Sequence, residues 1–99
     1  MTDKPFPRPG ALPYLTVQGA PAAIEWYAKA FGAELIGEPI VMDDGRIGHA
    51  ELRLHTGMIY LAEEFPEIGL TAPESGSTSV SMMLPVADTD DVLARVRDK

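Results

Sequence analysis

A short apolar strand pattern followed by a helix pattern occurs twice in this sequence, with a constant offset of 69 residues. Two apolar positions in each strand and two in each helix coincide. In pairs they are Leu15 and Leu84, Val17 and Val86, Ile24 and Leu93, and Tyr27 and Val96. Two copies in the same register are typical of a duplicated supersecondary module. The chain is therefore expected to fold as a small repeated unit, with the second copy incomplete in this chain.

The first copy carries a clear helix signal. Pro21 lies in the first turn, where a helix tolerates proline. Gly32 is a typical helix stop. Between them, apolar side chains recur at helical spacing. They are Ile24, Tyr27, Ala28 and Phe31.

Three strand patterns follow this helix. Residues 34–42 predict a strand that Pro39 weakens, and the Asp-Asp-Gly sequence at 43–45 is a hairpin turn signal. Residues 47–54 alternate between two faces, and residues 58–62 form a further apolar run.

Together with a first strand at 11–17, these patterns predict one α+β module of βαβββ order over residues 11–63. Residues 1–10 contain three prolines and predict an irregular N-terminal tail. Residues 64–77 are polar and rich in proline and glycine, which is typical of a linker loop.

Residues 78–99 predict the start of a second module, with a strand at 79–86 and then a helix. Asp88 or Thr89 can cap this helix. Asp90 then lies in its first turn, where the helix dipole favours negative charge. We interpret these acidic residues as a helix cap rather than a metal site.

Four segments carry a family resemblance. PYLTVQGAPAAIEWYAKAFGAEL, GRIGHAELRL, MIYLAEEFPE and SMMLPVADTDDVLARV resemble, in the same order, the PhnB-like branch of the vicinal oxygen chelate (glyoxalase/bleomycin-resistance/dioxygenase) superfamily. The resemblance implies duplicated βαβββ modules whose curved mixed sheets form an open cup. That superfamily includes lyases, isomerases, dioxygenases, thiol transferases and drug-binding proteins, so fold alone does not select a reaction.

Strand alternation predicts which side chains point into the cup. Leu15 and Val17 should face the helix. The side chains expected in the cup are Leu12, Tyr14, Thr16, His49, Glu51, Arg53, Met58, Tyr60, Ser81 and Met83.

The resemblance also implies a divalent metal in the cup of many members. By our register the corresponding ligand positions are Leu12, Tyr60 and Ser81, none of which is a usual transition-metal ligand. We therefore assign no metal ligand in this chain, and the cofactor stays unassigned.

His49 and Glu51 lie two apart on one strand, about 6.6 Å from each other along it. This spacing suits a histidine oriented by a carboxylate, for substrate contact or acid/base work, or two metal ligands; it also suits ordinary polar decoration of a solvated face, which is the default interpretation. Arg53 could hold an anionic group through its forked donors, or it could pair with a neighbouring carboxylate.

Charge and composition exclude some partners. The formal net charge of −7 disfavours nucleic acid and anionic membrane surfaces. The chain has no cysteine, no apolar run of bilayer length and no apolar core in its first ten residues, so we expect a cytoplasmic protein.

The function predicted from the sequence is binding of a small, partly apolar molecule in the cup, without the usual metal. The alternative is a lyase- or isomerase-type enzyme that uses His49 as acid or base, with any metal ligands supplied from outside this chain. An unpaired strand at 79–86 would leave open edges, so we expect a homodimer that exchanges residues 78–98.

Overall fold

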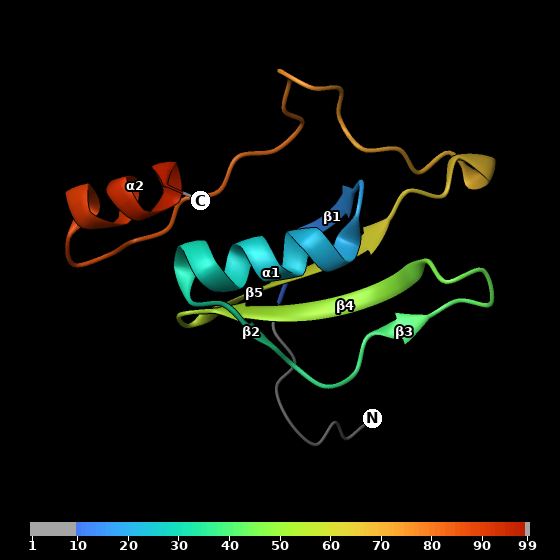
Figure 1. The fold of residues 1–99 in the computed structure, drawn as a ribbon, viewed down its shortest axis with the longest axis horizontal. Coiled ribbons are helices and arrows are strands. Elements are labelled where there is room, and N and C mark those ends of the chain that lie inside the picture. Colours follow the sequence, from blue (N-terminus) through green and yellow to red (C-terminus); the bar gives the residue numbers. More distant parts are fainter. Residues whose placement is uncertain (1–9, 99) are drawn as a thin grey trace.

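The computed structural model describes residues 10–98, which form a curved, open, mixed sheet with one helix packed on it and a second helix beside the first (Figure 1). The strand order is β1-β5-β4-β2, and β3 pairs with the far end of β4. β1 (Tyr14–Val17) runs parallel to β5 (Gly57–Glu63), whereas β4 (Ile47–Leu54) runs antiparallel to β5. The α+β class and the βαβββ order predicted from the sequence are confirmed.

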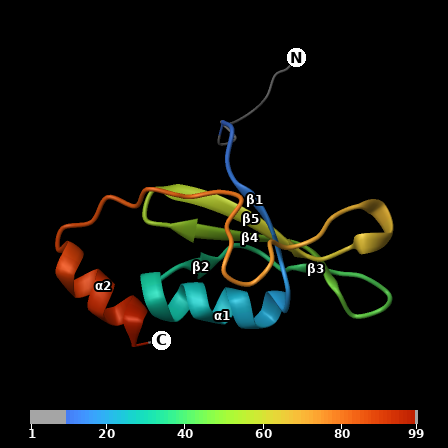
Figure 2. The ribbon, with the colours of Figure 1, turned by 90° about the horizontal axis from the view of Figure 1, so that it is seen from above.

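Helix α1 (Ala20–Phe31) covers one face of the sheet and leaves the opposite face open (Figure 2). Gly32 ends it in the left-handed conformation, with φ of 70°, and its N–H donates to the carbonyl of Ala28. Ile24, Tyr27 and Phe31 pack against the core as expected. Ala28 does not, since it faces solvent, whereas Ala30 is fully buried.

The core lies between α1 and the inner face of β4 and β5. Leu52 and Leu61 are almost fully buried there, and Leu15 and Val17 pack against them from β1. The predicted helix-facing side of the first strand is therefore confirmed. Burial of such side chains is the main source of stability in a unit of this size.

Gly48 marks a β-bulge in β4. Ile40 pairs with His49 but Val41 pairs with Ile47, so β4 has one residue more than β3 at this point. The extra residue turns Ile47 into the core, where it is 7% exposed. Strict alternation had placed Ile47 on the same face as His49, and that expectation is wrong.

The strand expected at 34–42 is interrupted. It forms β2 (Glu34–Leu35) and β3 (Ile40–Val41), since Gly37 adopts a positive φ and Pro39 has no N–H to donate to a ladder. The predicted hairpin turn at 43–45 forms, with Gly45 at φ of 90°.

After β5 the chain passes through a short 3₁₀ helix, η1 (Pro66–Ile68), and a long loop to helix α2 (Thr89–Arg97). The Asp88 side chain caps α2 by accepting from the N–H of Asp91. Arg95 ties α2 to the end of α1 through a hydrogen bond to the carbonyl of Ala30.

The strand expected at 79–86 does not form in the described chain. A strand needs a hydrogen-bonding neighbour, and among the described residues no backbone hydrogen bond joins residues 79–86 to another segment. Figure 1 shows this segment as an orange coil that leads to α2. Within residues 10–98, no helix combines the length and apolarity needed to cross a bilayer.

Candidate functional site

The open face of the sheet carries a row of polar and aromatic side chains from three adjacent strands. Tyr14 of β1 is in register with Tyr60 of β5, and Tyr60 is in register with Glu51 of β4. His49 lies two residues before Glu51, on the same face. The fold therefore gathers four side chains that the sequence placed in the cup.

A hydrogen-bonded chain links three of these residues. The Tyr14 hydroxyl lies 2.7 Å from His49 Nδ1, and His49 Nε2 lies 2.8 Å from Glu51 Oε2. Edge-to-face contacts join the rings, with centroids 5.8 Å apart for Tyr14 and Tyr60 and 4.9 Å apart for His49 and Tyr60. Tyr60 thus supports the chain from the central strand.

Burial raises the pKa of Tyr14, and the nearby negative charge of Glu51 raises it further. Both effects disfavour the phenolate. Tyr14 therefore enters the chain as a protonated phenol, able to donate its hydrogen to His49.

An apolar hollow of about 490 Å³ adjoins this polar row. Its floor comes from β1, β4 and β5 and its walls from the chain around β3 and η1. The residues that line it are Tyr14, Thr16, Met42, Gly48, Ala62, Phe65, Ile68 and Leu70. The combination of a partly apolar cavity and a few convergent polar groups is typical of small-molecule sites.

Arg46 holds one wall of this hollow in place. Its guanidinium contacts Asp44 at 2.7 Å and Glu67 at 2.7 Å, and it also donates to the carbonyl of Glu64 at 3.0 Å. The same group lies 4.0 Å over the ring of Phe65. These contacts raise the pKa of Arg46 and lower the pKa values of Asp44 and Glu67, chiefly through the hydrogen bonds between them.

Sequence reasoning missed this wall, because it treated the segment after residue 63 as a linker. The available signal was the apolar content of that segment, in which Phe65, Ile68 and Leu70 interrupt an otherwise polar run. The pairing of Arg46 with Glu67 had no comparable signal.

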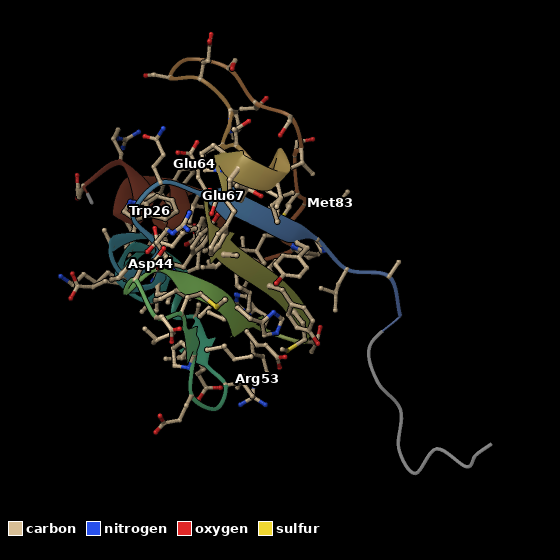
Figure 3. The ribbon with its side chains drawn as sticks, turned by 90° about the vertical axis from the view of Figure 1, so that its right-hand side faces the viewer. Trp26, Asp44, Arg53, Glu64, Glu67 and Met83 are labelled. Atoms are coloured by element: carbon tan, nitrogen blue, oxygen red, sulfur yellow. The ribbon has the colours of Figure 1, made fainter. Side chains whose placement is uncertain are left out.

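Other predicted site residues lie apart from the row. Arg53 pairs with Glu34 of β2, and in Figure 3 it lies at the border of the sheet away from Glu64 and Glu67. Its fork is therefore occupied by a carboxylate of this chain.

Met58, Ser81 and Met83 line a different hollow, of about 540 Å³, together with Trp26 and other residues of the helix side. The structure thus separates Ser81 and Met83 from Tyr14 and His49. They were expected in the cup because residues 79–86 were expected to form a strand of the sheet.

The described residues do not fit a divalent metal in the cup. Both ring nitrogens of His49 are engaged, by Tyr14 and Glu51. Within residues 10–98, no three side chains of histidine, cysteine, aspartate or glutamate come together as a ligand set. No mechanistic step through a metal follows from this chain.

Comparison with known proteins gives relatives without assigned roles. The uncharacterized proteins Mb0911c of Mycobacterium bovis and Rv0887c of Mycobacterium tuberculosis are each 34% identical to this chain over an alignment of 86 residues, and the match covers 83% of this chain. The match covers 56% and 50% of their respective lengths, so the chain spans about half the length of the curated relatives it matches. No protein-family profile matches the chain.

Among solved structures, TioX from Micromonospora sp. ML1 superposes with a TM-score of 0.62. The chain shares the fold of TioX. The superposition covers 91% of this chain and 69% of TioX, at 22% sequence identity. At that identity the likeness concerns architecture alone.

Proposed function

We propose that the open face of the sheet binds a small, partly apolar molecule, as in a glyoxalase/bleomycin-resistance-like protein of the vicinal oxygen chelate superfamily that lacks the usual metal. The observation that carries this proposal is the apolar hollow beside the Tyr14–His49–Glu51 chain. The apolar walls exclude water from one part of a ligand while the polar row fixes another part.

Two matched variants test the proposal. Ile68→Asp puts a charge on the wall of the hollow, at a side chain that is 70% exposed and therefore tolerant of substitution. Met83→Asp makes the same charge change at the second hollow, at a side chain that is 88% exposed. Small aromatic fragments would be titrated into isotope-labelled protein and their positions mapped by amide chemical shifts.

The expected result is that fragments shift the amides of Gly48, Ala62 and Leu70, and that Ile68→Asp weakens this binding while Met83→Asp leaves it unchanged. If the fragments instead gather around Trp26, or if Met83→Asp is the damaging variant, the helix-side hollow is the binding site and the proposal fails.

The hydrogen-bonded chain also supports an alternative, a lyase- or isomerase-type enzyme with His49 as the base. In that scheme Tyr14 Oη takes a proton from the substrate as its own proton moves to His49 Nδ1. The imidazolium that forms is paired with Glu51. Deuterium incorporation next to the carbonyl of small carbonyl compounds, lost in His49→Gln, is the expected signature; equal exchange in both proteins would eliminate this alternative.

We also propose that the protein assembles as a homodimer that exchanges residues 78–98. Two observations support this proposal: a strand edge and a segment, neither of which has a pairing neighbour among the described residues. β1 pairs with β5 on one edge only among the described strands, and residues 79–86 belong to no strand and leave Val80, Met82 and Met83 exposed. Pairing between copies would satisfy both.

A further inference from the structure

We infer that the hollow selects a molecule whose polar end donates a hydrogen bond and is neutral or positively charged, such as a protonated amine, and that it discriminates against carboxylates. The inference rests on the proposed binding function, and it specifies the chemistry of the ligand. Two independent observations carry it: the direction of the hydrogen-bonded chain and the pairing of the nearby arginines.

The direction of the chain follows from its carboxylate end. An ionised carboxylate only accepts hydrogen bonds, so His49 Nε2 must carry the proton that it shares with Glu51 at 2.8 Å. In a neutral imidazole the other nitrogen then has a lone pair. His49 Nδ1 therefore accepts the Tyr14 hydroxyl proton at 2.7 Å.

This arrangement leaves Tyr14 Oη as the acceptor at the free end of the chain. Its only proton points to His49, and its remaining lone pair is available to a partner. Tyr14 lines the hollow and is 54% exposed, so a bound molecule can reach this oxygen. A ligand N–H or O–H fits that position, whereas a carboxylate oxygen would meet another acceptor.

The charges around the hollow point the same way. Arg46 donates hydrogen bonds to Asp44, to Glu67 and to the backbone carbonyl of Glu64. Arg53 is paired with Glu34. Both of these arginines are therefore paired with carboxylates, and Glu51 adds negative charge to the row.

The aromatic faces of Tyr14 and Tyr60 add to this preference, because the face of a phenol ring attracts cations. The whole chain carries a formal charge of −7, which raises the local concentration of cations and lowers that of anions.

Three aromatic probes of similar size test the inference: benzylammonium, benzyl alcohol and benzoate. Each would be titrated into the isotope-labelled full chain at about pH 8, where an ordinary imidazole is neutral and an alkylamine is still protonated. The amides of Gly48, Ala62 and Leu70 report on the hollow. Benzylammonium is expected to bind at least about tenfold more tightly than benzoate, the size of effect typical of a hydrogen bond to a charged group.

Two variants identify the oxygen responsible. Tyr14→Phe removes the proposed acceptor but keeps the ring, so the preference for benzylammonium over benzoate should fall to a fewfold difference. Tyr27→Phe is the matched control, because it removes a phenol oxygen from helix α1, which covers the opposite face of the sheet. It should leave the preference intact.

The outcomes separate the two levels of the proposal. If benzoate binds as tightly as benzylammonium, or if Tyr27→Phe rather than Tyr14→Phe abolishes the preference, the donor selection is wrong although the hollow still binds ligands. If none of the three probes shifts the amides of the hollow, the proposed binding function itself fails, and the inference fails with it.

Discussion

At the scale of single residues, the most informative group is the imidazole of His49. Both of its nitrogens are within hydrogen-bond distance of a partner of known chemistry, so its tautomer is fixed by its surroundings. The proton that His49 shares with Glu51 therefore sets the direction of the hydrogen bond between Tyr14 and His49.

The tautomer is directly measurable. When the His49 imidazole is neutral, we expect its nitrogen chemical shifts to report a protonated Nε2 and an unprotonated Nδ1, because the Glu51 carboxylate can only accept a hydrogen bond. Glu51→Gln should shift the balance between tautomers, since an amide can donate as well as accept. Long-range proton–nitrogen spectra make the measurement, with His55 as an internal reference; a protonated Nδ1 in the unmodified protein would contradict the assigned direction.

Sequence reasoning worked best for these individual positions. Because β4 alternates from His49 onward and β1 and β5 lie in register with it, Tyr14, Glu51 and Tyr60 share one face as expected. The pairings of Arg46 and Arg53 could not be predicted in the same way, because each depends on which loop or strand comes close in space.

At the scale of secondary-structure elements, the central strands bear most of the stability. Leu52 of β4 is 1% exposed and packs beneath α1. Leu52→Ala should lower the free energy of unfolding by about 2–5 kcal/mol, since it removes buried methyl groups and leaves a cavity. Leu35→Ala in β2 is the control, at a side chain that is 42% exposed. Urea unfolding of both variants measures the difference, and equal losses would show that the core is not where the fold places it.

The ion pairs of Arg46 with Asp44 and Glu67, which we call the clamp, join the β3–β4 turn to η1 and should respond to acid. Arg46 lowers the pKa values of Asp44 and Glu67. The stability that these two ion pairs add is therefore fully present above the ordinary carboxyl pKa range, and it is lost as the pH falls through the lowered pKa values. We expect the amide signals of residues 65–70 to move over that acidic range.

Arg46→Gln serves as the comparison for this titration. Without the guanidinium, the two carboxyl groups should titrate closer to their ordinary pKa values, and the response of residues 65–70 should shift to higher pH. An unchanged titration in the variant would mean that the clamp does not position this wall of the hollow.

Secondary-structure elements could be predicted where signals within the element set its bounds. They could not be predicted where the element depends on a neighbouring strand to pair with. Pro21 and Gly32 bracket α1 correctly, because helix ends are set within the helix itself. The bulge at Gly48 changed the face of Ile47, although a glycine inside a strand is a known sign of one. The prediction of a strand at 79–86 was wrong for a different reason, because no neighbouring strand pairs with this segment in the described part of the chain.

At the scale of the whole molecule, the proposed dimer is open to a simple measurement. Light scattering across a dilution series should give twice the chain mass of 10.7 kDa at high concentration. Val80→Pro should favour the monomer, because it removes a backbone donor from the exchanged segment, whereas Val80→Thr keeps that donor. A single mass equal to one chain at every concentration would defeat the proposal.

The parallel pairing of β1 with β5 also constrains the order in which this molecule can assemble. Its two partners come from opposite ends of the βαβββ unit, so the contact between Tyr14 and Tyr60 closes a long loop and carries a large entropic cost. The β4–β5 hairpin can form from local contacts, but β1 has to wait for it. Tyr14 thus joins His49 and Glu51 late in folding, and a chain emerging from the ribosome cannot assemble this row until β5 is complete.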